Sequence, residues 1–387
     1  MSLKSRRLKK VLIGAVLVAA VGALSGCHTL QFYGQAIKGQ YQLVAHEQSI
    51  LKLTNDPHTP PRLKQRLDLL ERLRAFAAQE LKLPVDDHYR KYVDVHRPFV
   101  VWNVEAAPQF SLQARTWWYP LVGSLEYRGY FSLRGATNYA GYLRRKGYDV
   151  SVGGVSAYST LGWFKDPALS TFLFDSEAEL AETVFHELAH QRLFAHGDTD
   201  FNEAFATSVG EEGARRWLKT NGTAAELDQY AAHLRRNDQF VHLVIATRVR
   251  LEAVYGDAVS QGVRVKATSK NHDVSAAQLL RQKQAVLEDM KNEYARLKAA
   301  WGGDPEYDGW FAHQVNNAGL NSVAAYYDFV PGFDRLLAQN GGDLEKYYAA
   351  AKAISKKPKK ERHEALRVLA KEAKTGSEAE GVSAPGH

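Results

Sequence analysis

The segment from Ser176 to His190 constrains the fold of this chain most, because it predicts one particular buried helix. Ser176 and Glu179 have the S-x-x-E spacing of a capping box, which marks the start of a helix. A stripe of aliphatic side chains then recurs every four residues, at Leu180, Val184 and Leu188. This spacing predicts a helix that buries one face against the core.

Two histidines on this helix predict a metal site. His186 and His190 are four residues apart, so both imidazoles project from one face, one turn from each other. Two nitrogens at that separation can share one zinc ion at about 2.0–2.1 Å. Glu187 lies beside them, where it can reach a water on the metal without binding the metal itself. The segment has the H-E-x-x-H pattern, in which the glutamate is the general base of a metallopeptidase.

Catalytic zinc needs three protein ligands, and His196 is one candidate for the third. It lies six residues after His190, which is the offset used by the metzincin peptidases. Leu193, however, occupies the position of the glycine that turns the chain back in those proteins. The methionine turn is missing as well, because Met290 lies in a charged helical stretch. We therefore do not favour His196.

Glu203 is the favoured third ligand. The Asn202-Glu203 pair resembles the start of the second zinc-binding helix in gluzincins, which coordinate zinc through two histidines and a glutamate. A turn at 197–198 would end the first helix and let the second fold back onto it. Asn202 and Thr207 are expected to support the ligands from behind, Thr207 by steadying a histidine ring.

A tetrahedral oxyanion would need a hydrogen-bond donor besides the metal. The candidates are Tyr158 and Tyr326, followed by Arg128. Residues 153–164 are expected to hold the edge strand of the cleft, to which a peptide backbone can add antiparallel.

The N-terminus resembles a lipoprotein export signal. A basic start precedes a short apolar run from Val11 to Leu24, which ends in Leu24-Ser25-Gly26-Cys27. This pattern predicts lipidation of Cys27 and attachment to the bacterial cell envelope. His28 follows where an aspartate would signal retention in the inner membrane, so the outer membrane is favoured. Cys27 is the only cysteine of the chain, which excludes a disulfide framework and a cysteine-rich zinc cluster.

The net charge of +7 comes from the two ends of the chain. Five basic residues lie among the first ten, and residues 352–374 contribute nine basic and three acidic side chains. The remainder is close to neutral, so the composition argues against nucleic-acid binding. We expect the basic C-terminal segment to matter little for catalysis.

The predicted fold class is α+β, mainly helical, with a small mixed sheet of three or four strands beside the H-E-x-x-H helix and a helical C-terminal part. Aromatic and β-branched runs at 99–104, 117–131 and 148–155 predict the strands, and nearly everything after residue 175 is predicted to be helical. The expected parts are a signal peptide (1–26), an N-terminal helical segment (27–85), a sheet with the zinc-binding helices (86–222), a helical domain that closes the cleft (223–350), and a basic helix with a disordered tail (351–387).

Several segments resemble a family of bacterial proteins described as predicted zinc aminopeptidases. The resemblance runs in order from about residue 30 to 350 and is carried by FYGQA at 32–36 with GQ at 39–40, VWNV at 101–104 with AP at 107–108, YRGYF at 127–131, AYSTLGWF at 157–164 with DP at 166–167, FHELAHQ at 185–191, Asp198 with FNE at 201–203, NA at 317–318 and Tyr326. It implies a metallopeptidase fold, one zinc ion and aminopeptidase activity. The chain departs from the family pattern at 209–211, where an acidic residue would come sooner.

Two other functions compete with a peptidase. The first is a non-enzymatic envelope scaffold, whose zinc would be enclosed by four protein ligands, with both His196 and Glu203 bound. Glu187 argues against it, since a purely structural site needs no base. The second is a zinc hydrolase of a non-peptide amide.

An aminopeptidase would also need a further carboxylate for the substrate ammonium, for which Glu126, Glu211 and Glu212 are the candidates.

Overall fold

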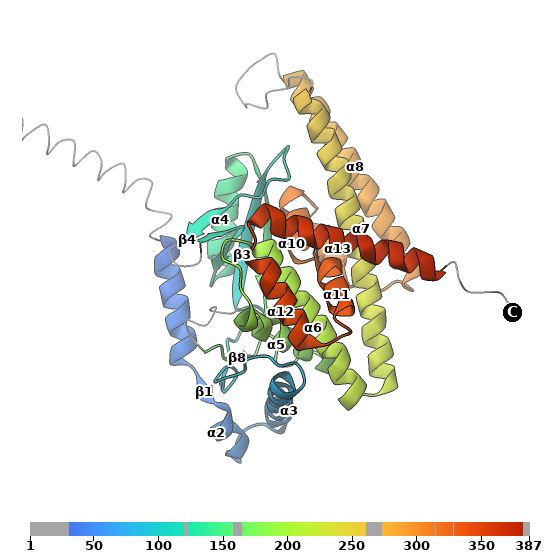
Figure 1. Ribbon diagram of the computed structural model, residues 1–387. Helices are drawn as coiled ribbons and strands as arrows, with labels where there is room; N and C mark the ends of the chain where they lie inside the picture. The colour runs from blue at the N-terminus through green and yellow to red at the C-terminus, as the bar shows by residue number, and fades with distance from the viewer. Residues whose placement is uncertain are drawn as a thin grey trace, which may run out of the picture.

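The computed structural model describes residues 31–119, 123–157, 165–260, 273–313, 315–327 and 329–381 (Figure 1). The helices are one over residues 31–45, α2 (Ile50–Asn55), α3 (Pro61–Gln79), α4 (Leu133–Arg145), α5 (Glu177–Arg192), α6 (Thr199–Asn221), α7 (Ala224–Ser260), α8 (Asp273–Ala300), α9 (Asp308–His313), α10 (Asn317–Tyr327), α11 (Val330–Gln339), α12 (Leu344–Ser355) and α13 (Lys359–Gly381). The strands are β1 (Gln48–Ser49), β2 (Lys91–Val93), β3 (Val101–Pro108), β4 (Trp117–Tyr119), β5 (Gly123–Leu125), β6 (Tyr127–Tyr130), β7 (Tyr148–Val155) and β8 (Ala168–Leu169). No helix within these ranges is both long and apolar enough to span a bilayer. The signal segment and Cys27 lie outside them.

The fold class is α+β and mainly helical, as predicted. The strands do not form one sheet, however. They form two three-stranded sheets, ordered β1-β2-β8 and β6-β3-β7, and the hairpin β4-β5. The sheet that carries β3 in its centre is antiparallel throughout, and β7 is an edge strand. The edge strand was expected within residues 153–164, but it begins earlier, at Tyr148, and ends at Val155, and residues 158–164 lie outside the described part of the chain.

The two faces of the β6-β3-β7 sheet have different partners. Side chains alternate along a strand, and those of Trp102, Val104 and Ala106 enter a core covered by α4 and the helix over 31–45. Figure 1 shows α4 lying against this sheet. The alternate side chains of β3, from Val101 to Glu105, face a cavity on the other side of the sheet. The sheet therefore has a packed core on one face and the cavity on the other.

The main core surrounds α5. Leu180, Val184 and Leu188 are completely buried, which confirms the predicted apolar stripe. The ring of Phe185 packs against Phe76 of α3. At about 1.5–3 kcal/mol for each large buried side chain, such contacts hold α5 in place between α3 and α6.

Two predicted helices are interrupted. Within the N-terminal segment that was predicted to be helical, the first helix stops at Ala45, and β1 follows before α2 begins. Within the stretch predicted to be helical after residue 175, residues 308–327 are divided into α9 and α10. The side chain of Asn316 accepts hydrogen bonds from the backbone N–H groups of Ala318 and Gly319, so it begins a new helix there.

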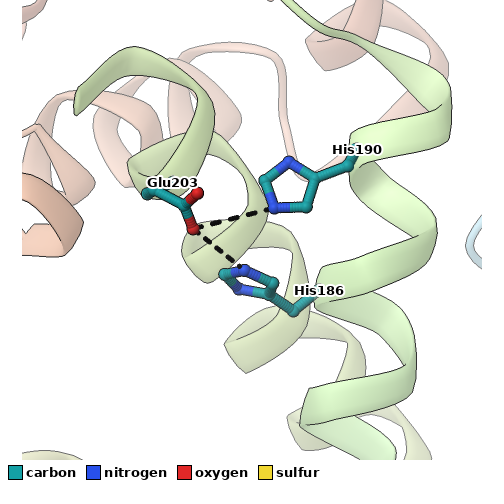
Figure 2. A group of neighbouring side chains, drawn as sticks. All are labelled: His186, His190 and Glu203. Atoms are coloured by element: carbon teal, nitrogen blue, oxygen red, sulfur yellow. Dashed lines mark ion pairs between the residues drawn. The ribbon is translucent and has the colours of Figure 1, made fainter. Parts of the chain in front are cut away.

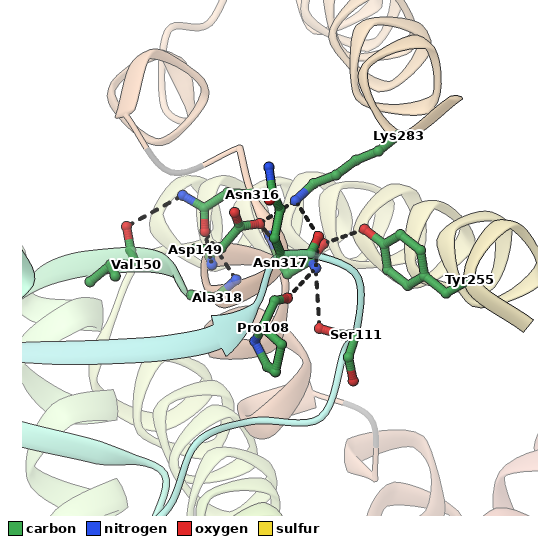
Figure 3. A network of polar contacts seen from close by, with 11 residues as sticks. Pro108, Ser111, Asp149, Val150, Tyr255, Lys283, Asn316, Asn317 and Ala318 are labelled. Atoms are coloured by element: carbon green, nitrogen blue, oxygen red, sulfur yellow. Dashed lines mark hydrogen bonds and ion pairs between the residues drawn. The ribbon is translucent and has the colours of Figure 1, made fainter. Parts of the chain in front are cut away.

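A buried polar network holds α10 against the sheet (Figure 3). The side chain of Asn317 is fully buried and accepts a hydrogen bond from Tyr255 of α7. Its amide group donates to three backbone carbonyls at and just beyond the end of β3, those of Pro108, Gln109 and Ser111. Asp149 of β7 accepts from the Asn317 backbone and pairs with Lys283 of α8. The network fixes the position of α10, which forms part of the cavity wall.

The C-terminal segment is part of the folded body. α13 packs along α11 and extends to Gly381, past residue 375, where we expected disorder to begin. Leu366 on this helix is completely buried. The backbone oxygen of Leu366 lies so close to Gly332 that a Cβ atom there would come within 2.4 Å.

Candidate functional site

The site is built on the second half of α5. Ser176 caps this helix, and Glu179 completes the capping box, as predicted. His186 and His190 project from one face, with ring centroids 4.9 Å apart. The site histidines therefore stand on a helix that is capped at its start and buried along its length.

A tight turn brings the next helix back onto α5. α5 ends at Arg192, and Gly197 adopts a φ of +73°, in the left-handed region that glycine tolerates best. Asn202 is buried and exchanges two hydrogen bonds with the backbone of Ala195, at 2.7 and 2.9 Å. Asn202 therefore holds the turn closed just before Glu203.

α6 can approach α5 closely because Gly210 faces the metal-binding side. A Cβ atom at Gly210 would lie 3.0 Å from the backbone oxygen of Glu182 and 3.2 Å from the Cβ of His186. Any larger residue would push against the histidine-bearing turn. The position next to His186 is therefore crowded, and glycine allows the two helices to approach without displacing this turn.

His186, His190 and Glu203 converge into one candidate metal-binding group (Figure 2). The Nε2 atoms of His186 and His190 lie 3.4 and 3.7 Å from Glu203 Oε2. One ligand atom from each residue lies within 4.8 Å of the others. Burial alone would raise the pKa of Glu203, but the two histidines hold it well below its usual value. The group therefore places an ionised carboxylate beside two imidazoles, which suits a cation.

The group opens into a cavity of about 750 Å³. Its walls come from β3, β6 and β7 on one side, from α5 and α6 on another, and from α9 and α10. The cavity is therefore continuous with the metal-binding group and bordered by the edge strand β7.

Glu187 lines this cavity beside the histidines. Burial raises the pKa of Glu187, whereas the neighbouring His186 and His190 lower it. The carboxyl group is therefore in the position expected of a general base, since it faces the cavity and does not belong to the metal-binding group.

Arg128 does not reach the cavity, so the expectation that it contacts the reacting atoms is wrong. Its guanidinium lies 4.1 Å from the ring centroid of Phe32 and donates to the hydroxyl of Tyr139, in the core on the α4 side of the sheet. The reason is the alternation of strand side chains: on β6, Tyr127 and Gly129 face the cavity, and Arg128 between them faces away.

The described structure adds two tyrosines to the candidates for the oxyanion donor. Tyr158 and the side chain of Tyr326 lie outside the described part of the chain. Tyr127 and Tyr327, which we did not single out, both line the cavity. Tyr127 lies near Glu203 and Glu187, and burial raises the pKa of its hydroxyl, so the group stays protonated and can donate a hydrogen bond. Tyr127 could have been considered from the sequence, because it is the strand neighbour of the candidate Arg128 and its side chain must face the opposite side of the sheet.

Two other expectations concern the surroundings of the histidines. His196 is not part of the metal-binding group in the described structure, and its ring contacts Phe194 instead. Thr207 is buried on α6. The buried Nδ1 of His190 has no hydrogen-bond partner in the described structure, so Thr207 does not steady the His190 ring through this atom.

None of the three acidic residues considered for a substrate ammonium lines the main cavity. Glu126 faces a small adjoining pocket, and Glu212 pairs with Arg215 and Arg216. Burial raises the pKa of Glu211 well above its usual value, and nearby Glu182 and Asp334 raise it further.

A buried ionic cluster ties the turn before α6 to the C-terminal helix. Asp198 is 1% exposed and caps α6 through the backbone N–H of Phe201. Its carboxylate also binds Arg362 at 2.7 Å and His363 at 2.8 Å, with Lys359 at 3.6 Å. The basic C-terminal segment therefore supports the helix that carries Glu203. These contacts argue against the expectation that the segment matters little for catalysis, which stays a prediction to be tested.

We expect Arg362→Met to lower the free energy of unfolding by about 2–4 kcal/mol, because it leaves a buried carboxylate with fewer partners. It should also weaken metal binding, since the first turn of α6 loses its anchor. Thermal unfolding and metal titration would measure both effects. Lys360→Met is the matched control, because Lys360 is exposed on the same helix. Equal effects of the two substitutions would contradict this role of Asp198.

Comparison with known proteins identifies one family. A family model described as "Putative aminopeptidase" matches residues 31–366. No curated protein and no solved structure matches the chain.

Proposed function

Because the chain belongs to this aminopeptidase family, we propose that it is a zinc-dependent peptidase that uses Glu187 as its general base. The observation that carries the proposal is the convergence of His186, His190 and Glu203 beside a large cavity. The family supports peptidase activity, and the metal and the base are inferred from the site.

Zinc fits the donor set. Imidazole nitrogens and a carboxylate oxygen are the ligands that catalytic zinc prefers. In a tetrahedral site with bonds of 2.0–2.1 Å, neighbouring ligand atoms lie about 3.4 Å apart. The two distances to Glu203 Oε2, 3.4 and 3.7 Å, are close to this value. The three residues would therefore need little movement to hold the ion.

The metal and the residues around the cavity would have separate roles in hydrolysis. When bound, zinc supplies a Lewis acid that polarises a substrate carbonyl and makes water more acidic. Glu187 accepts a proton from the attacking water and delivers it to the leaving amine. Tyr127 and Tyr327 are the hydroxyl donors that line the cavity and can stabilise the oxyanion.

The edge strand provides a track for the substrate. Gly153, Gly154 and Val155 of β7 line the cavity, and the outer side of this strand has no neighbour in the described sheet. A peptide can add to it by backbone hydrogen bonds, which bind any sequence. This arrangement favours a peptide over a non-peptide amide as the substrate.

A peptide-library digest tests the proposal. We expect zinc-loaded protein lacking residues 1–27 to cleave peptides, and the cleavage to stop when a chelator removes the metal. Absence of cleavage in a broad library at full zinc occupancy would refute it. The scaffold alternative predicts this absence, but it also needs a fourth protein ligand, and His196 does not join the group within the described residues.

We also propose that Cys27 carries a lipid that attaches the protein to the cell envelope, facing the periplasm from the outer membrane. The support is the basic start, the short apolar run and the single cysteine at its end.

Cys27→Ala should leave an unprocessed precursor that incorporates no labelled palmitate, because the thiol that accepts the lipid is missing. The measurement is labelling in growing cells, with the unchanged chain as the positive control. Labelling of the Cys27→Ala precursor would contradict the lipid anchor.

A further inference from the structure

The walls of the cavity are acidic. Four glutamates line it, Glu105, Glu182, Glu187 and Glu203, and no lysine or arginine lines it in the described part of the chain. Apart from the metal-binding group itself, a carboxylate of a substrate would find no lysine or arginine to pair with among the described lining residues, and burying an unpaired charge is costly. The cavity therefore suits a substrate that brings a positive charge.

Three of the four carboxyl groups are already engaged. Glu203 belongs to the metal-binding group, and Glu187 is the proposed base. Glu182 accepts a hydrogen bond of 2.7 Å from the hydroxyl of Tyr230 and lies near His186 and His233. Glu105 remains: its partners are the hydroxyls of Ser151 and Ser322, and no cation among the described residues is found to act on its carboxyl group.

Glu105 occupies the middle of the sheet that faces the metal-binding group. On central strand β3 it is paired with Tyr127 of β6 on one side and with Ser151 of β7 on the other. Tyr127 lies within electrostatic range of Glu105, Glu187 and Glu203, and all four residues line the same cavity. Burial raises the pKa of Glu105 to about 8, and nearby Glu126 contributes to the rise. A bound cation would favour the ionised form.

We propose that Glu105 binds the ammonium group of the substrate, which makes a peptide with a free ammonium beside the scissile bond the preferred substrate class. This inference rests on the proposed peptidase function, since it concerns the same cavity. The ammonium can be the α-amino terminus or a lysine side chain. The two sources predict different ligands, and binding experiments can separate them.

The test measures binding by calorimetry, in zinc-loaded protein with the Glu187→Gln substitution so that the probes persist. The probes are leucinamide, N-acetyl-leucinamide and N-acetyl-lysinamide. An α-ammonium site predicts that leucinamide binds about thirtyfold or more tightly than its acetylated form, the size expected for a buried charge pair. Adding Glu105→Gln should remove most of this difference and leave the affinity for N-acetyl-leucinamide unchanged. Preferential binding of N-acetyl-lysinamide, lost in the same way, would assign the site to a lysine side chain.

Glu126→Gln is the matched control, because Glu126 lies near Glu105 but outside the main cavity. It should change the affinities by about twofold or less, as a charge acting through water does. Zinc content and thermal unfolding show whether each variant is folded. An ammonium preference that survives Glu105→Gln, or no preference in the parent protein, would overturn the inference. The binding measurement needs no turnover, so it is independent of the peptide digest. Cleavage without Glu105-dependent binding would refute only the ammonium site. Glu105-dependent binding without cleavage would refute only the peptidase function.

Discussion

Glu187→Gln is expected to reduce peptide hydrolysis by at least about a hundredfold while zinc content stays at the wild-type level. A positioned general base contributes about 10²–10⁴ to the rate, and glutamine cannot accept the proton. The metal should remain because Glu187 lies beside the metal-binding group without belonging to it. Steady-state kinetics and metal analysis of the same preparation would measure the two quantities together.

Glu182→Gln is the control for this experiment. Glu182 is on the same helix and lines the same cavity, but Tyr230 holds its carboxylate, and a glutamine oxygen can accept the same hydrogen bond. Most of the activity should survive. If the Glu187 variant turned over peptides at the wild-type rate, the assignment of the base would be wrong.

The second large effect concerns the third metal ligand. Glu203→Ala should weaken zinc binding by more than about a hundredfold, because even residues that only support metal ligands contribute 10–100-fold. His196→Ala should bind zinc as the wild type does, since its ring lies against Phe194 and outside the metal-binding group. Competition with a chromogenic chelator gives both affinities. Zinc loss in the His196 variant alone would favour the metzincin-like arrangement despite Leu193.

The local parts of the site could be predicted because their signals are short-range. A capping box, an apolar stripe and two histidines four residues apart all lie within residues 176–190, and a helix places them together without help from the rest of the fold. The approach of Glu203 to both histidines could not be predicted from these short-range signals alone. It depends on the turn at Gly197 and on the missing side chain at Gly210, and only the turn was recognised in advance.

The wrong assignment of Arg128 shows the limit of strand patterns. Alternation predicts that Tyr127 and Arg128 face opposite sides of the sheet, but it does not say which side borders the cavity. That choice is made by α4, which covers the side of Arg128, and by α5 and α10, which leave space on the other. Glu105 was missed although a charged residue within an apolar strand was a visible signal.

Contacts between distant parts of the chain could not be foreseen at all. Asp198 meets Arg362 across 164 positions of sequence, and a basic stretch near a chain end looks the same whether it is solvated or folded against a buried carboxylate. The break between α9 and α10 had a local signal, because Asn316 is a residue type that often caps the start of a helix.

Zinc reconstitution tests whether peptide hydrolysis by this protein depends on one bound zinc ion. Protein lacking residues 1–27 would be stripped of metal, and peptide hydrolysis would be followed as zinc is added back. We predict no hydrolysis by the metal-free protein and a rate of hydrolysis that rises until one zinc ion is bound per chain. Full hydrolysis by the metal-free protein, or none after complete zinc loading, would contradict it.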